Sequence, residues 1–286
     1  MKQEDYFKQL QTAPIDRGLQ YWENGSGQPV LFLHGALSNG YTYRKILTEL
    51  SQSFHCLALH LPLGGHQLPL SKDVELSPSG IAALIQAFLH FKAIQQVTII
   101  ANDTGGAYAQ VFTALHPEMV SSLVLSNCEV MDVFPPQKFA YLKCAVRIPG
   151  FTFLMAKLFS INSWLTHPAV MGSLSLTLTR EELASGYIHS FVKNAGIRKN
   201  FADVCRHWHP KHTLEAANLL QDFDKPVLVL WGDQDNGLFP RQQMEKLLQV
   251  FPHAKWQTIF NAKTYIQEDA PEQVIAAIQT FLCPES

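Results

Sequence analysis

Asp103 lies in a short run of residues whose types could carry out nucleophilic chemistry. Residues 99–106 read Ile-Ile-Ala-Asn-Asp-Thr-Gly-Gly, so that β-branched residues precede Asp103 and small residues surround it. A strand that ends in such a tight turn before a helix raises one side chain above the sheet, with backbone N–H groups close behind it. A carboxylate there suits attack on an alkyl carbon, or proton transfer, better than acyl transfer from an ester. Alternatively, Asp103 is a buried turn residue whose side chain caps the next helix.

The elements that must position Asp103 alternate along the chain. The hydrophobic pattern predicts strands over 19–23, 30–34, 55–61, 97–101, 122–127, 226–232 and 256–260, and helices over 41–50, 78–91, 104–116 and 271–282, with another after Pro240. Apolar strands that alternate with helices predict a parallel sheet that is covered on both faces. The first two strands flank Asn24-Gly25-Ser26-Gly27, which predicts a hairpin between them.

The alternation stops near Asp132 and resumes near residue 221, which predicts a core domain of residues 1–131 and 221–286 with a helical cap over 132–220. The most apolar region, 148–178, lies in this insertion, and its prolines, glycines and polar residues argue against a membrane-spanning helix. We expect its apolar side chains to cover a pocket for a hydrophobic small molecule. Where exposed, the same surface could serve a homodimer contact or a membrane face.

The composition narrows the choice of partners. The chain has 286 residues, a net charge of −2 and a pI near 6.6, from which we expect no basic face that could bind nucleic acid. The polar, acid-containing N-terminus is not typical of a secretory signal. Five cysteines without Cys-x-x-Cys spacing predict reduced thiols in a cytoplasmic protein. We expect no metal, no organic cofactor and no membrane partner.

In chain order, the landmarks are His34-Gly35, the turn at Asp103, the insertion, and Trp231-Gly232-Asp233-Gln234-Asp235. Together they resemble the α/β-hydrolase superfamily over nearly the whole chain. The aspartate at the turn is similar to the haloalkane dehalogenase and epoxide hydrolase branch. This resemblance implies the α/β-hydrolase fold, a mostly parallel sheet with a helical cap insertion, and Asp103 as the reactive carboxylate.

The resemblance also assigns supporting roles. It implies that the backbone N–H groups of Ala36 and Thr104 are oxyanion donors. It places the supporting acid at Asp235, or alternatively at Glu129. Asp235 could instead be a turn-forming residue, and Glu129 a solvated acid at the entrance to the cap.

Thr264 occupies the position at which this superfamily has its histidine base, because residues 261–271 align without gaps with the corresponding loop. Threonine cannot serve as a base near neutral pH, so the usual hydrolysis of a covalent ester by histidine-activated water lacks its base. Thr104 also replaces the Trp or Arg with which dehalogenases hold halide, and Ala36 has no polar side chain for that purpose. A dehalogenase is therefore disfavoured.

Several replacements for the missing base remain open. His60, His66, His207 or His209 could take its place, whereas His34 is expected to brace the oxyanion loop. Without an imidazole, Asp103 could face a second carboxyl, and burial together with like charge would then keep one of the two protonated near neutrality.

We therefore expect a hydrolase-like enzyme that acts on a hydrophobic small molecule. The alternatives are a non-hydrolytic acid/base enzyme, an isomerase or lyase, and a ligand-binding protein that has lost catalysis. An epoxide hydrolase would in addition need two acidic hydroxyls from the cap, for which Tyr141 and Tyr187 are candidates.

Overall fold

A computed structural model describes residues 1–168 and 170–283. An eight-stranded sheet in the order β1-β2-β4-β3-β5-β6-β7-β8 forms its centre. The strands from β4 to β8 in this order run parallel, whereas β1 and β2 form an antiparallel edge. The strands are β1 (Gln11–Ala13), β2 (Leu19–Asn24), β3 (Pro29–Leu33), β4 (His55–Leu59), β5 (Val97–Asn102), β6 (Val120–Ser126), β7 (Val227–Gly232) and β8 (Lys255–Ile259).

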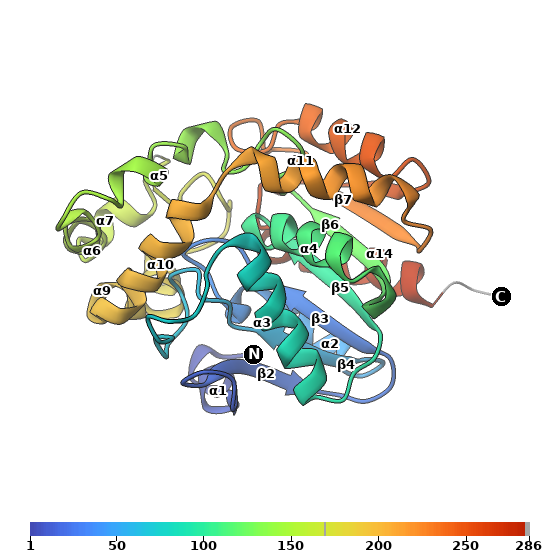
Figure 1. Cartoon of the computed structure of the whole chain (residues 1–286), viewed down its shortest axis with the longest axis horizontal. Helices are drawn as coiled ribbons and strands as arrows, with labels where there is room; N and C mark the ends of the chain where they lie inside the picture. The colour runs from blue at the N-terminus through green and yellow to red at the C-terminus, as the bar shows by residue number, and fades with distance from the viewer. Residues whose placement is uncertain (169, 284–286) are drawn as a thin grey trace.

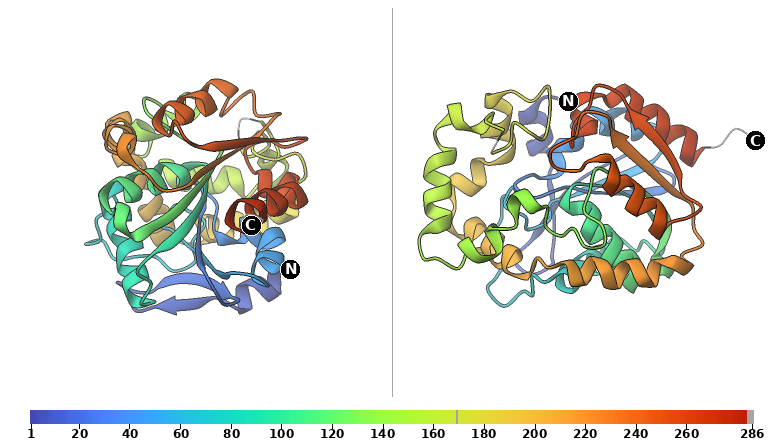
Figure 2. Two further views of the ribbon diagram at one scale, coloured as in Figure 1. Left: turned by 90° about the vertical axis from the view of Figure 1, so that its right-hand side faces the viewer. Right: turned by 90° about the horizontal axis from the view of Figure 1, so that it is seen from above.

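Helices cover both faces of the sheet, as continuous apolar strands require. In Figures 1 and 2, α3 and α4 lie on one face, and α2 and α14 lie on the other. The helices are α1 (Gln3–Lys8), α2 (Arg44–Leu50), α3 (Pro78–Phe91), α4 (Thr104–Leu115), α5 (Leu142–Ala145), α6 (Phe151–Phe159), α7 (Asn162–Leu165), α8 (Arg180–Glu182), α9 (His189–Lys193), α10 (Ala195–His207), α11 (Pro210–Leu219), α12 (Arg241–Val250), α13 (Ile266–Asp269) and α14 (Pro271–Leu282). This is the covered parallel sheet that the strand and helix order predicted, and the α/β-hydrolase fold that the resemblance implied.

The predicted hairpin between the first two long strands is wrong. β2 pairs with β4 through Tyr21 and Leu59, and β4 in turn pairs with β3, so that β4 lies between them. The glycine-containing loop does not close a tight turn but crosses the start of β4. Gly25 has a φ of 85°, and a Cβ atom there would lie 2.1 Å from the Phe54 carbonyl oxygen.

The insertion forms a cap of short helices beyond the carboxyl ends of the parallel strands. Helices α5, α6, α7, α9 and α10 lie together at one end of the molecule (Figure 1). Helix α11 falls inside the predicted cap range, yet it packs along α4 of the core. The division into core and cap otherwise stays a prediction. In the part of the chain that the structure describes, no helix has the length and apolar character needed to cross a bilayer.

Candidate functional site

Asp103 occupies the sharp turn between β5 and α4 with a φ of 53°, a conformation that is costly for a residue with a side chain. Neighbouring glycines make the turn possible. A Cβ atom on Gly35 would lie 1.9 Å from Asp103 Oδ2, and one on Gly105 would lie 2.3 Å from the Leu33 carbonyl oxygen. The Asp103 side chain makes no capping hydrogen bond to α4, so the interpretation of Asp103 as a helix cap is wrong.

Backbone amides hold the Asp103 carboxyl from one side. The N–H groups of Ala36 and Thr104 lie close to it, and both lower its pKa by favouring the charged form. His34 holds the loop that carries Ala36: its Nδ1 donates to the Gly35 carbonyl oxygen over 2.8 Å, and its Nε2 accepts from the Leu61 N–H over 2.9 Å. This agrees with the bracing role expected of His34. Burial lowers the pKa of His34 to about 3, so its imidazole is neutral.

Thr264 and Asp235 form a direct pair on another side of the turn. The Thr264 hydroxyl donates to Asp235 Oδ2 over 2.6 Å, and no imidazole lies between the two residues. Asn127 also donates to this oxygen, whereas the Leu238 and Phe239 N–H groups bond to Oδ1. Asp235 therefore holds the turn at residues 235–239, as the interpretation of a turn-forming residue proposed. It also contacts Thr264, which occupies the expected base position.

Glu129 is buried beside Asp103, so the expectation of a solvated acid is wrong. Its Oε1 accepts a hydrogen bond from the Thr104 hydroxyl over 3.0 Å, whereas its Oε2 has no hydrogen-bond partner in the described residues. Burial, with a further contribution from the charge of Asp103, raises the pKa of Glu129 well above its ordinary value. Burial therefore favours the protonated form of the Glu129 carboxyl over its charged form.

Burial also raises the pKa of Asp103, to about 7, and the negative charge of Asp235 adds to this effect. The amides of Ala36 and Thr104 act in the opposite direction without cancelling it. Two carboxyl groups with raised pKa values, Asp103 and Glu129, thus lie in one buried site. This is the environment in which one acid can hold a proton while the other is ionised.

The four histidines considered as replacement bases lie elsewhere. His60 contacts the Tyr6 hydroxyl, and His66 hydrogen-bonds to Asn200. His207 bonds to the Asp203 carbonyl oxygen, and His209 accepts from a backbone N–H at the start of α11. None of the four lines the cavity above Asp103. The hypothesis of a relocated histidine at these positions is wrong.

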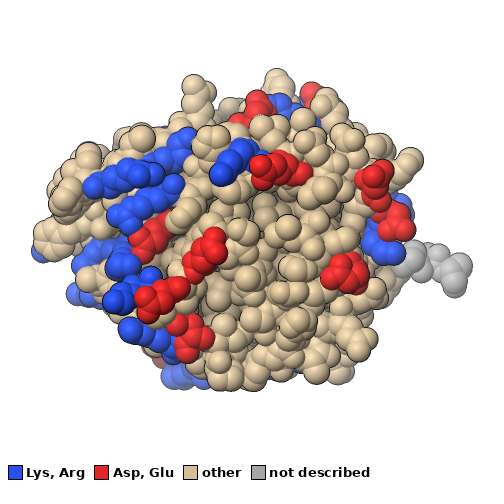
Figure 3. Space-filling view, in the orientation of Figure 1, with Lys and Arg blue, Asp and Glu red and all other residues tan. Residues whose placement is uncertain are grey.

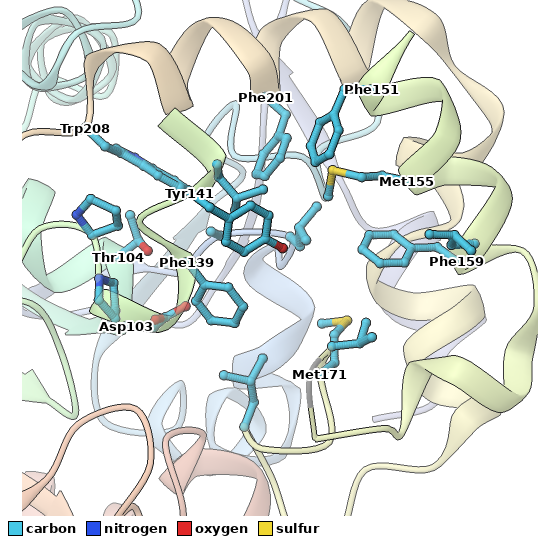
Figure 4. Close-up of a pocket in the computed structure, with 18 of the residues that line it drawn as sticks. Asp103, Thr104, Phe139, Tyr141, Phe151, Met155, Phe159, Met171, Phe201 and Trp208 are labelled. Atoms are coloured by element: carbon cyan, nitrogen blue, oxygen red, sulfur yellow. The ribbon is translucent and has the colours of Figure 1, made fainter. Parts of the chain in front are cut away.

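A cavity of about 280 Å³ lies between Asp103 and the cap. Figure 4 shows Asp103 and Thr104 at one end, Met155 and Phe159 of α6 at the other, and Tyr141 between them. Most of the wall is aliphatic or aromatic, and Glu129 supplies the remaining carboxyl. An uncharged, hydrophobic molecule fits such a cavity.

The cap hydroxyls proposed from the sequence differ in their positions. Tyr141 lines the cavity, whereas Tyr187 is buried outside the cavity wall and its hydroxyl donates to Glu268. The sequence also drew attention to His207 and His209, yet the residue between them, Trp208, reaches the cavity. Trp208 donates from its indole N–H to the Tyr108 hydroxyl. The sequence feature that could have identified Trp208 as a cavity residue is its large aromatic side chain between two histidines at the end of the insertion.

No group of three or more His, Cys, Asp or Glu side chains within residues 1–168 and 170–283 is placed to hold a metal ion. The cavity wall also lacks a basic side chain that could hold a phosphate group. The described wall offers two carboxyls, backbone amides and the hydroxyls of Thr104 and Tyr141, set among apolar side chains.

Residues 30–277 match the model of the Alpha/beta hydrolase family. The chain belongs to this family. It is 25% identical over 271 residues to Haloalkane dehalogenase 2 of Mycobacterium tuberculosis, covering 91% of this chain and 90% of the relative. It is 25% identical over 285 residues to Epoxide hydrolase 3 of Xenopus tropicalis, covering 93% and 76% of the two chains. The solved structure of epoxide hydrolase CorEH superposes with a TM-score of 0.78 at 19% identity, covering 96% and 98%, which supports the fold alone.

Proposed function

We propose that this protein is a hydrolase that acts on a hydrophobic small molecule through Asp103, and that Glu129 performs the proton transfers for which relatives use a histidine. The observation that carries this proposal is the position of both carboxyls on the wall of one apolar cavity, while Thr264 bonds directly to Asp235. The resemblance of the chain to a haloalkane dehalogenase and an epoxide hydrolase supports attack on an alkyl carbon.

The site favours a substrate whose leaving atom is an oxygen, such as an epoxide. In the first step, an Asp103 carboxylate oxygen attacks a ring carbon, and the bond between that carbon and the ring oxygen breaks. The oxygen takes the proton of Glu129, which leaves a hydroxyalkyl ester on Asp103 and a carboxylate on Glu129. A halide would need side-chain N–H donors beside the backbone amides, and the side chains of Ala36 and Thr104 supply none.

The second step returns the protein to its starting state. The Glu129 carboxylate accepts a proton from a water molecule, whose oxygen attacks the carbonyl carbon of the ester. The N–H groups of Ala36 and Thr104 stabilise the negative oxygen that develops. Collapse of this intermediate releases the alkoxide and leaves Asp103 as a carboxylic acid. The alkoxide takes the proton of this acid to give the diol, which regenerates the Asp103 carboxylate, while Glu129 keeps the proton that it took from water. Glu129 thus serves first as acid and then as base.

Intact-mass spectrometry and diol analysis with styrene oxide test this function. Wild-type protein should form diol, and Asp103→Asn should form neither diol nor adduct. Glu129→Gln keeps the size of the side chain but cannot transfer a proton, so diol formation should fall by about 10²–10⁴-fold. Glu181→Gln, an exposed acid on α8, is the matched control and should behave as wild type.

Unchanged turnover in Glu129→Gln would contradict the proposed role of Glu129. A wild-type protein that binds hydrophobic epoxides without adduct or diol would favour the ligand-binding alternative. Loss of the epoxide to an isomer rather than a diol would favour the acid/base alternative.

A further inference from the structure

The charges of this chain are divided between its cap and its core. Residues 133–209 carry nine Lys or Arg and three Asp or Glu, whereas the rest of the chain carries 13 and 21. The net charge of −2 therefore conceals a positive cap on a negative core. In Figure 3, Lys and Arg side chains gather over the cap, so the expectation that the chain has no basic face is wrong. A charge asymmetry of this size indicates a surface that meets a negatively charged partner.

The same region exposes large apolar side chains on one helix face. Phe153, Leu154 and Leu158 of α6 are 55%, 57% and 43% exposed. At 100° per residue these positions fall within less than half of the helix circumference, and Lys157 lies among them. The Lys157 ammonium is 5.3 Å from the centre of the Phe153 ring.

This exposed face continues beyond α6. Ile161 and Trp164 are 48% and 50% exposed. We call Phe153, Leu154, Lys157, Leu158, Ile161 and Trp164 the cap face. Helices α6 and α7, which carry most of it, lie at the outer end of the cap, away from the sheet (Figure 1). Contiguous apolar exposure of this kind marks an interaction site rather than ordinary surface.

We propose that the cap face binds the surface of an anionic lipid bilayer. Its aromatic and aliphatic side chains would enter the boundary between headgroups and acyl chains, and the Lys and Arg residues around them would meet the negative headgroups. A second copy of this chain is the weaker candidate, because a symmetric contact would bring two positive caps together. No part of the chain needs to cross the bilayer for this contact.

The cap face and the cavity share residues. Leu154, Leu158 and Trp164 are exposed and also line the cavity above Asp103. A hydrophobic molecule dissolved in the bilayer could thus reach the cavity along apolar side chains. This link to the cavity rests on the proposed function, whereas binding of the cap face to a bilayer does not.

Co-sedimentation of the full chain with vesicles tests the proposal. We expect binding to phosphatidylcholine vesicles that contain 30% phosphatidylglycerol, and weak binding to phosphatidylcholine alone. Phe153→Ser, at a position outside the cavity wall, should reduce the partition coefficient about tenfold, because it removes a large apolar contact. Lys157→Gln should reduce it about fivefold, and raised salt should weaken wild-type binding.

Phe260→Ser is the matched control, because Phe260 is 60% exposed on the core, and its binding should equal that of wild type. Equal circular dichroism spectra and melting temperatures show that the variants are folded. Absence of binding, equal binding to both vesicle types, or unchanged binding of Phe153→Ser would overturn the proposal. A dimer in light scattering that Phe153→Ser dissociates, without vesicle binding, would overturn it in favour of a self-contact.

Discussion

Replacing Asp103 with asparagine should change how the stability of this protein depends on pH. Burial and the charge of Asp235 raise the pKa of Asp103 from 3.8 to about 7. The folded protein therefore holds a proton on Asp103 over a pH range in which the unfolded chain has released it. A raised pKa contributes stability at low pH, and this contribution is lost as the pH rises through about 7.

The expected size follows from these two pKa values. Between pH 5 and pH 8, Asp103 should reduce the free energy of unfolding of the wild type by about 2.5 kcal/mol. Asparagine at this position keeps the shape of the side chain but cannot ionise, so the free energy of unfolding of the Asp103→Asn variant should not fall for this reason. At about 2 °C per kcal/mol for a chain of this size, the melting temperature of the variant relative to wild type should rise by about 5 °C between the two pH values.

Differential scanning calorimetry at pH 5, 6, 7 and 8 and constant ionic strength measures this difference. Groups that titrate alike in both proteins cancel in the comparison. Asp73→Asn, at an exposed loop position, is the matched control and should keep a constant difference from wild type. A melting-temperature difference for Asp103→Asn that is the same at pH 5 and pH 8 would refute the argument that the buried site raises the pKa of Asp103.

Three further expectations follow from the site and its surroundings. Wild-type protein should hydrolyse p-nitrophenyl acetate negligibly, because Asp103 stands where esterases of this fold have a serine nucleophile. Release of nitrophenolate measures this activity, and efficient hydrolysis that Asp103→Asn abolishes would contradict the expectation. Thr264→His should raise the rate at which an alkyl ester on Asp103 is hydrolysed, because Asp235 Oδ2 lies 2.6 Å from the Thr264 hydroxyl and would orient an imidazole at this position. Mass spectrometry of the alkylated protein over time measures this rate. An unchanged rate would contradict the interpretation of residue 264 as the base position. Glu268→Ala should lower the free energy of unfolding in urea by about 3–5 kcal/mol, because it leaves the buried guanidinium of Arg44 without one of its two carboxylates, whereas exposed Glu181→Ala should have little effect.

The turn at Asp103 could be predicted from the sequence because its evidence is local. A β-branched strand, an aspartate and two glycines occur within eight residues, and the order of the later landmarks restricts the fold. The interpretation of Thr264 as the residue at the base position also rests on local evidence, because residues 261–271 align without gaps with the corresponding loop of the superfamily. The pairing of β2 with β4 could not be predicted in this way, because it joins segments that are distant in sequence, and the intervening glycines are equally typical of a hairpin.

The state of Glu129 depends on tertiary structure that the sequence pattern does not contain. Glu129 is fully buried, and the same residue on an open surface would be an ordinary charged acid. The cap was also difficult to predict in detail. Its helices are short, and apolar residues on α6 face solvent as well as the cavity, so their spacing shows no single buried stripe.

In the native sheet β4 lies between β2 and β3, so these two strands, which are neighbours in sequence, do not pair with each other. A hairpin between β2 and β3 would close in about 1–10 μs, since its loop is short. The native partner of β2 comes about thirty residues later, and closing that longer loop costs more chain entropy. A β2–β3 hairpin, if it formed, would have to open before β4 could pair with both strands. In the folded chain, Gly25 has a left-handed conformation and lies against the Phe54 carbonyl oxygen just before β4, a close approach that a hairpin between β2 and β3 would not have.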